Sequence, residues 1–322
     1  MVGRHFDREV VITALKQALP YIRLYRGRTF VIKAGGALCG DDAALRDIAE
    51  QVSVLCELGV RVVLVHGGGP QTTAVSDKLG LETNFVNGRR VTSPETLAVA
   101  VMTLNGSVNT AMLSAFRAVA LPAVGISGVD AGFINAVRRP PQIVEQNGVR
   151  TAMDFGLVGD IVAVDASVVT RLLDAGVVPV VSPLSAADDG QVLNLNADTV
   201  ASTLACALGA EKLIFLTDTT GLLEDKRKPA SLVSYVDIAG LSALAASGAI
   251  DAGMLPKIEA ASAALRGGVK RVHMVGYKGR ATLLLEVFTN EGSGTLVVRS
   301  ISELSCAEQH EEGGAQPAAE AG

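Results

Sequence analysis

The chain has 322 residues, and its 28 Lys and Arg against 33 Asp and Glu give a formal net charge of -5. This balance offers no basic surface for nucleic acid and no polybasic patch for a membrane. Hydrophobic residues make up 49% of the chain without any Trp, so an aliphatic core on the scale of a large α/β domain is expected. The four cysteines form no C-x-x-C pair, which indicates reduced thiols in a cytoplasmic protein without a metal cluster. No apolar run approaches about 18 residues, so no membrane span is expected.

The predicted elements begin with an amphipathic helix over residues 10–25, in which Pro20 predicts a kink or a restart. Short aliphatic runs then alternate with longer helical patterns, which predicts an open, mainly parallel sheet sandwiched by helices. Ser93 before Pro94 predicts a helix start, and Gly209 predicts the end of a helix from about 198. Strands are expected at residues 29–33, 60–65, 122–126, 178–182, 212–217, 271–275 and 295–298.

Two segments lack the aliphatic patterns of the strands and helices. Residues 138–154 are polar and contain Pro140, Pro141, Asn147 and Gly148, which predicts an exposed hairpin. The chain from 301 to 322 is simple and polar, which predicts a disordered tail.

Two glycine-bearing turns follow aliphatic strands, Lys33-Ala34-Gly35-Gly36 and His66-Gly67-Gly68-Gly69-Pro70. Glycines there leave backbone N–H groups open to phosphate or carboxylate oxygens, and Lys33 adds a positive charge. Neither turn fits the Gly-x-Gly-x-x-Gly or P-loop pattern. One such turn alone is most often a tight connection, but two at strand ends indicate a ligand site.

Further polar residues stand at turns beside expected helix starts. Arg90 offers a planar fork for a carboxylate, and Asn194 and Asn196 offer neutral donors and acceptors. Asp198 is placed either to cap the helix that follows or to hold lysines in position. A cation at Lys257 opposes the dipole of its helix unless an anion offsets it.

The order and spacing of these segments over roughly residues 14–298 resemble the amino acid kinase family, and within it the acetylglutamate kinases of arginine biosynthesis. The matching motifs are Ala18-Leu19-Pro20-Tyr21-Ile22, Val31-Ile32-Lys33-Ala34-Gly35-Gly36, Val65-His66-Gly67-Gly68-Gly69-Pro70, Gly88-Arg89-Arg90-Val91-Thr92, Leu193-Asn194-Leu195-Asn196-Ala197-Asp198, Leu216-Thr217-Asp218 and Gly253-Met254-Leu255-Pro256-Lys257.

The resemblance implies phosphorylation of the γ-carboxylate of N-acetyl-L-glutamate by ATP, with Mg²⁺ bound through the nucleotide. It also implies an oligomerisation helix at 1–26, an N-lobe at 27–185 for the acylated amino acid, and a C-lobe at 186–300 for the nucleotide. Carried over position by position, it implies catalysis by Lys33, Lys257 and Asp198, phosphate binding by the amides of Gly35, Gly36 and Gly68, acceptor binding by Gly68, Gly69, Arg90, Asn194 and Asn196, and nucleotide binding by Thr217 and Asp218.

The N-terminal helix resembles the extension that joins dimers of arginine-inhibited members into a hexameric ring. Its alternative is an ordinary helix packed on its own domain. The residues at positions that resemble the arginine site are Tyr21, His273, Glu286 and Gly292. Residues 223–229 also resemble members that bind the PII signal protein.

Two residues differ from those that many family members have: Ala34 stands in place of Tyr, and Ser107 stands in place of Lys. Such differences can change which acidic amino acid serves as the acceptor. A kinase of another acidic amino acid, such as aminoadipate, is therefore one alternative. A sensor that binds nucleotide or arginine without turnover is another.

Overall fold

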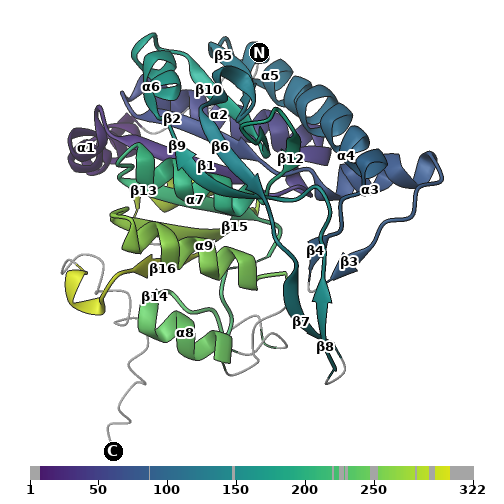
Figure 1. The fold of residues 1–322 in the computed structure, drawn as a ribbon. Helices are drawn as coiled ribbons and strands as arrows, with labels where there is room; N and C mark the ends of the chain where they lie inside the picture. Colours follow the sequence, from purple (N-terminus) through teal and green to yellow (C-terminus); the bar gives the residue numbers. More distant parts are fainter. Residues whose placement is uncertain are drawn as a thin grey trace, which may run out of the picture.

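A mainly parallel sheet runs through the whole molecule (Figure 1). The computed structural model describes residues 8–86, 88–146, 149–219, 221–224, 228, 231–246, 253–279, 281–289 and 294–304. The eight strands lie in the order β14-β16-β15-β13-β1-β2-β10-β5, and only β15 and β16 are antiparallel neighbours. They are β1 (Thr29–Ala34), β2 (Arg61–His66), β5 (Ala123–Ser127), β10 (Val178–Ser182), β13 (Lys212–Thr217), β14 (Tyr235–Asp237), β15 (Arg271–Gly276) and β16 (Thr295–Val298). The expected fold class and all the expected strands are confirmed, while the short edge strand β14 was missed.

Helices cover both faces of this sheet (Figure 1). Val31 of β1 packs on the face covered by α6, α7, α8 and α9, whereas Phe30 and Ile32 pack on the face covered by α2, α5 and α10. Because both faces are buried, the strands are almost entirely aliphatic. The helices are α1 (Arg8–Tyr25), α2 (Asp42–Glu57), α3 (Gly69–Lys78), α4 (Pro94–Val101), α5 (Asn109–Ala118), α6 (Ser167–Asp174), α7 (Ala197–Ala207), α8 (Ile238–Ala246), α9 (Leu255–Arg266) and α10 (Thr282–Phe288).

Smaller sheets lie beside the central one. The sequence did not predict the four-stranded sheet, in the order β12-β11-β6-β9, because its strands are short or mix polar with apolar residues. The hairpin expected within 138–154 is present as β7 and β8, and β3 and β4 form a second ribbon. The bounds are β3 (Phe85–Val86), β4 (Arg89–Arg90), β6 (Ile134–Arg138), β7 (Gln142–Gln146), β8 (Val149–Met153), β9 (Gly159–Val164), β11 (Leu184–Ala186) and β12 (Val192–Asn194).

The expected helix boundaries agree with the structure. The Ser93 hydroxyl caps α4 by accepting from the Thr96 amide, and Gly209, with φ +56°, follows α7. The helix α1 continues through Pro20, which excludes the restart, while the expected kink stays a prediction. At the other end, residues 301–303 form a 3-10 turn and Leu304 is buried, so the described chain stays ordered to this point. The rest of the expected tail, 305–322, lies outside the described residues.

One helical segment, Pro94–Ala118, is long and apolar enough to cross a membrane by length and composition alone. It consists of α4, a π-helical stretch from Met102 to Val108, and α5. Half of its most apolar stretch is buried inside the protein, with Met112 and Phe116 in the core. Core helices of soluble proteins pass the same test, so the segment is weak evidence for a membrane span.

Candidate functional site

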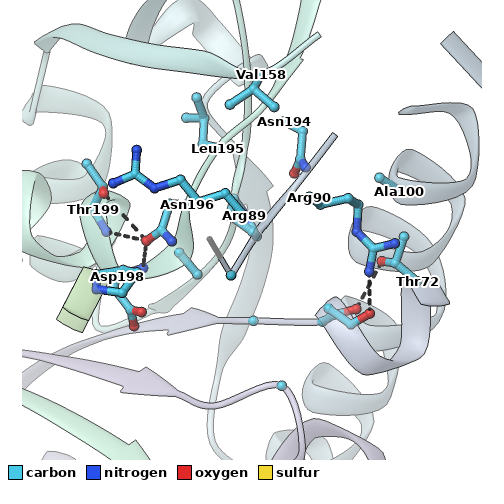
Figure 2. A pocket seen from close by; sticks show the side chains of 18 of the residues that line it. Thr72, Arg89, Arg90, Ala100, Val158, Asn194, Leu195, Asn196, Asp198 and Thr199 are labelled. Carbon is cyan, nitrogen blue, oxygen red and sulfur yellow. Dashed lines mark hydrogen bonds between the residues drawn. The ribbon is translucent and has the colours of Figure 1, made fainter. Parts of the chain in front are cut away.

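A cavity of about 260 Å³ opens where β1, β2 and β12 end (Figure 2). Ligand sites of open α/β sheets form at this edge, beyond the carboxyl ends of the strands. The predicted residues that line the cavity are Lys33, Gly36, Gly68, Gly69, Arg90, Asn194, Asn196 and Asp198.

Asp198 joins the two predicted lysines, of which Lys33 lines the cavity and Lys257 does not. Its Oδ1 atom lies 2.8 Å from Lys33 Nζ, and its Oδ2 atom lies 3.8 Å from Lys257 Nζ. Lys33 and Asp198 are each 5% exposed. Burial lowers the pKa of Lys257, and repulsion from Lys33 lowers it further, while Asp198 and Asp218 oppose the shift. Two cations that are 224 residues apart in the sequence thus meet at one carboxylate.

Asn196, not Asp198, caps α7. The Asn196 Oδ1 atom accepts hydrogen bonds from the amides of Asp198 and Thr199, at 2.8 and 3.0 Å (Figure 2). The cap therefore frees the Asp198 carboxylate for the lysines, so the alternative in which Asp198 caps the helix is wrong. The cap uses the side-chain oxygen of Asn196, so the side-chain Nδ2 group of this residue remains available to a ligand.

The two glycine turns touch each other at the cavity wall. A Cβ atom on Gly36 would lie 2.8 Å from the Pro70 ring and 3.3 Å from the amide nitrogens of Gly68 and Gly69, so only glycine allows this approach. Gly35 differs, because its N–H donates to the Leu216 carbonyl at 2.9 Å. This hydrogen bond occupies the Gly35 amide and corrects its predicted use for phosphate.

Arg90 lines the cavity with its guanidinium group. Its Nη2 group donates to the Gly69 carbonyl at 2.9 Å and to Thr73 Oγ1 at 2.7 Å, and its guanidinium lies 4.7 Å from the Phe85 ring centroid. These contacts hold the side chain in place. Nη1 is buried without a hydrogen-bond partner among the described residues. A buried donor on a permanent cation is suited to a carboxylate ligand.

Asn194 lines the cavity together with Arg90. Its Nδ2 group donates to Thr92 Oγ1 at 3.3 Å, and its backbone N–H donates to the Leu157 carbonyl. These bonds hold Asn194 at the end of β12, where its side chain lines the cavity (Figure 2).

Sequence reasoning gave no role to an ion pair at the cavity rim. Arg89 Nη2 lies 3.2 Å from Glu259 Oε2, so the pair connects β4 to α9. Both side chains line the cavity. In the sequence, Arg89 adjoins Arg90 and Glu259 lies two residues after Lys257. These positions do not indicate that Arg89 and Glu259 form an ion pair.

The two predicted nucleotide residues lie beside the cavity rather than in its lining. Thr217 ends β13 and is buried, with its hydroxyl donating to the Thr219 carbonyl at 2.7 Å. Asp218 is exposed and close enough to Lys257 to raise its pKa.

Residues 220, 225–227, 229–230, 247–252 and 280 are outside the described part of the chain. They include part of the segment that resembles the PII contact.

Three of the four residues predicted for arginine gather away from the cavity, beside α1. His273 Nδ1 lies 2.6 Å from Glu286 Oε1, and both side chains are buried. Tyr21 is connected to this pair by a series of contacts. Its ring stacks on the Tyr25 ring, and the Tyr25 ring centroid lies 5.1 Å from Lys212 Nζ. Lys212 Nζ also lies 2.9 Å from His273 Nε2, a contact that sequence reasoning missed. Gly292 lies outside the described residues.

Comparisons with known proteins agree with this geometry. Residues 28–276 match the amino acid kinase family. An acetylglutamate kinase of Myxococcus xanthus is 48% identical over 289 residues, which cover 89% of this chain and 94% of the relative. An acetylglutamate kinase of Heliobacterium modesticaldum is 40% identical over 88% of this chain and 97% of the relative.

Solved structures show the same fold. N-acetylglutamate synthase of Neisseria gonorrhoeae, in complex with coenzyme A and N-acetyl-glutamate, matches with a TM-score of 0.77 and 28% identity, over 90% of this chain and 63% of the synthase. Carbamate kinase of Giardia lamblia matches with a TM-score of 0.60 and 20% identity, over 84% of this chain and 98% of the other. The chain therefore belongs to the amino acid kinase family and, within it, to the acetylglutamate kinases.

Proposed function

We propose that this protein transfers the γ-phosphoryl group of ATP to the γ-carboxylate of N-acetyl-L-glutamate, in the cytoplasm and as a step of arginine biosynthesis. The observation that carries the proposal is the contact of Lys33 and Lys257 with the two oxygens of Asp198. Asp198 lines the same cavity as Arg90, whose Nη1 donor has no partner among the described residues. An acid-binding cavity and two converging cations are what phosphoryl transfer to a carboxylate requires.

The lysines act on the charge of the transferred group. Negative charge spreads over the moving phosphoryl group and over both flanking oxygens, so preorganised cations stabilise the transition state. Lys33 does this from the acceptor side and Lys257 from the nucleotide side, while Asp198 holds both in place. The amides of Gly36 and Gly68 neutralise phosphoryl oxygens. The acceptor needs no general base, because a carboxylate is already ionised at pH 7.

Recognition of the acceptor rests on the other cavity residues. Arg90, through the unpaired Nη1 group, and Asn194 bind the α-carboxylate of acetylglutamate, and Gly68 and Gly69 line the rest of its site. A half-buried arginine fork favours an acid over a neutral ligand.

The residues present also fit a nucleotide with magnesium. Lysine and glycine amides bind phosphates, and Thr217 and Asp218 contact the nucleotide at the end of β13. Among the described residues, no three His, Cys, Asp or Glu side chains gather to hold a metal. Mg²⁺ would be held by the nucleotide phosphates and water, and it would offset phosphate charge.

A coupled assay of ADP release tests the proposal against its alternatives. We expect N-acetyl-L-glutamate to give the highest kcat/KM in a panel that also contains glutamate, aspartate and acylated aminoadipate. Faster turnover of a longer or unacetylated acid would assign a different acceptor. Binding of nucleotide without ADP release would favour a sensor.

We further propose that L-arginine inhibits the enzyme and that α1 joins dimers into a hexameric ring. Three large apolar side chains of α1, Ile12, Leu15 and Leu19, are 43–59% exposed, and their spacing places them on one face. Near α1, Glu286 and Lys212 offer partners for the guanidinium and the carboxylate of arginine.

Removal of residues 1–26 is expected to reduce a hexamer to dimers in sedimentation and to abolish inhibition by arginine, because the truncation deletes both the apolar face and Tyr21. Glu286→Gln is the matched control. It keeps the helix, so we expect it to retain the full-length size and lose only the inhibition. An unchanged size after truncation would exclude a ring built by α1.

A further inference from the structure

His66, in the second glycine turn, lies next to the cavity but does not line it. Its side chain is 0% exposed. Its Nδ1 atom lies 3.0 Å from the Gly67 carbonyl oxygen, and its Nε2 atom lies 3.2 Å from Asn109 Nδ2. Burial lowers the pKa of His66 to about 4, so the ring is neutral at pH 7 and carries a single proton.

The position of that proton follows from the partners of the ring. Asn109 Nδ2 also lies 3.2 Å from the Val180 carbonyl oxygen, which can only accept, so the nitrogen end of the amide faces both groups. Asn109 therefore donates to His66 Nε2, and the ring proton must be on Nδ1. The Gly67 carbonyl can also only accept, which independently requires a proton on Nδ1.

The Nδ1–H group fixes the direction of one peptide plane. The Gly67 carbonyl and the Gly68 N–H belong to the same peptide, and no peptide bond in the described chain is cis. In a trans peptide these two groups point in opposite directions. When His66 holds the carbonyl, the Gly68 N–H points away from His66, toward the side where Gly36 and the cavity lie.

The space for Asn109 depends on a glycine of β5. A Cβ atom on Gly125 would lie within van der Waals distance of the Asn109 amide and clash with it. Gly125 therefore makes room for Asn109, Asn109 contacts His66, and His66 contacts Gly67. The hydrogen bonds among the last three residues allow only one assignment of donors and acceptors.

We propose that His66 is a positioning residue whose Nδ1–H group holds the Gly67–Gly68 peptide with the Gly68 amide directed at the phosphoryl group. This inference rests on the proposed function for its effect on turnover, but the tautomer can be measured without any turnover. Glycine-rich turns have little intrinsic preference between the two directions of a peptide plane, so an external hydrogen bond can decide it. Preorganised donors contribute to catalysis because they need no reorientation during the reaction.

Two isosteres separate the two ring nitrogens. In His66→Asn, the side-chain NH₂ takes the place of Nδ1–H and keeps the donor to Gly67. In His66→Gln, the side-chain oxygen takes the place of Nε2 and accepts from Asn109, which leaves Gly67 without its donor. We expect Asn to retain kcat within about threefold and Gln to lower kcat about tenfold or more, with little change in the KM for acetylglutamate.

Nitrogen-15 NMR of the histidine rings gives the second readout, with the His66 signals assigned by their loss in His66→Asn. We expect the wild-type ring to show the Nδ1–H tautomer, and the Nε2–H tautomer would overturn the inference. Equal losses of kcat in the two variants, or no loss in either, would also overturn it, because the donor to Gly67 would then be irrelevant. A wild-type protein that lacks kinase activity but shows the Nδ1–H tautomer would reject the proposed function and retain the hydrogen-bond assignment.

Discussion

Replacement of Lys33 by Ala is expected to lower kcat about 10²- to 10³-fold, roughly 3 kcal/mol of transition-state stabilisation, with a folded protein remaining. The Lys33 ammonium lies 2.8 Å from Asp198 and is 5% exposed, so neither water nor a surface ion can replace it readily. Asp198 keeps its contact with Lys257 in this variant, which limits the structural damage. Steady-state ADP release measures the effect, and thermal unfolding shows whether the fold persists.

Lys257→Ala tests the second cation in the same way, and we expect a loss of similar order. Lys270→Ala serves as the matched control, since Lys270 forms an exposed ion pair with Glu211 outside the cavity. Exposed pairs contribute little, so this control should keep both its turnover and its melting temperature. Wild-type turnover in either site variant would remove that lysine from the transition state.

The central sheet could be predicted from the sequence because its strands are buried on both faces. A run such as Phe30-Val31-Ile32 is apolar without interruption, and few other local structures require that. The sheet built from β6, β9, β11 and β12 could not be predicted, because β11 and β12 have only three residues each and β6 and β9 mix polar with apolar residues. At Pro20 the sequence allowed a restart of the helix, but α1 continues through the proline.

The candidate site was predictable where a motif fixes the chemistry. The positions of Lys33, Asp198 and Lys257 followed from the resemblance, and their contact agrees with it. Interactions such as Arg89 with Glu259 depend on how β4 and α9 meet, and no local pattern encodes that. The hydrogen bond of the Gly35 amide could not be predicted for the same reason. It depends on the pairing of β1 with β13, which brings the Leu216 carbonyl next to Gly35.

Asp198→Asn should destabilise the protein and lower kcat, because it removes the anion that lies between two cations. Truncating one partner of a buried ion pair typically costs about 3–5 kcal/mol, and Asn keeps the shape of Asp while removing the charge. Urea unfolding at pH 7 measures the loss of stability. Asp174→Asn is the control, because Asp174 pairs with Arg61 at the surface, where the loss should be small.

The variant should also change the dependence on pH. Asp198 raises the pKa of Lys257 against the effects of burial and Lys33, so removing its charge lowers that pKa further. The protonated lysine is then lost at lower pH, and the alkaline limb of the kcat profile should shift to lower pH. The free energy of unfolding should rise with pH between the lowered pKa and about 10.5, because the unfolded chain binds more protons than the folded one there. A variant with the wild-type alkaline limb would show that Asp198 does not set the charge of Lys257, and the central contact of the proposed mechanism would lose its role.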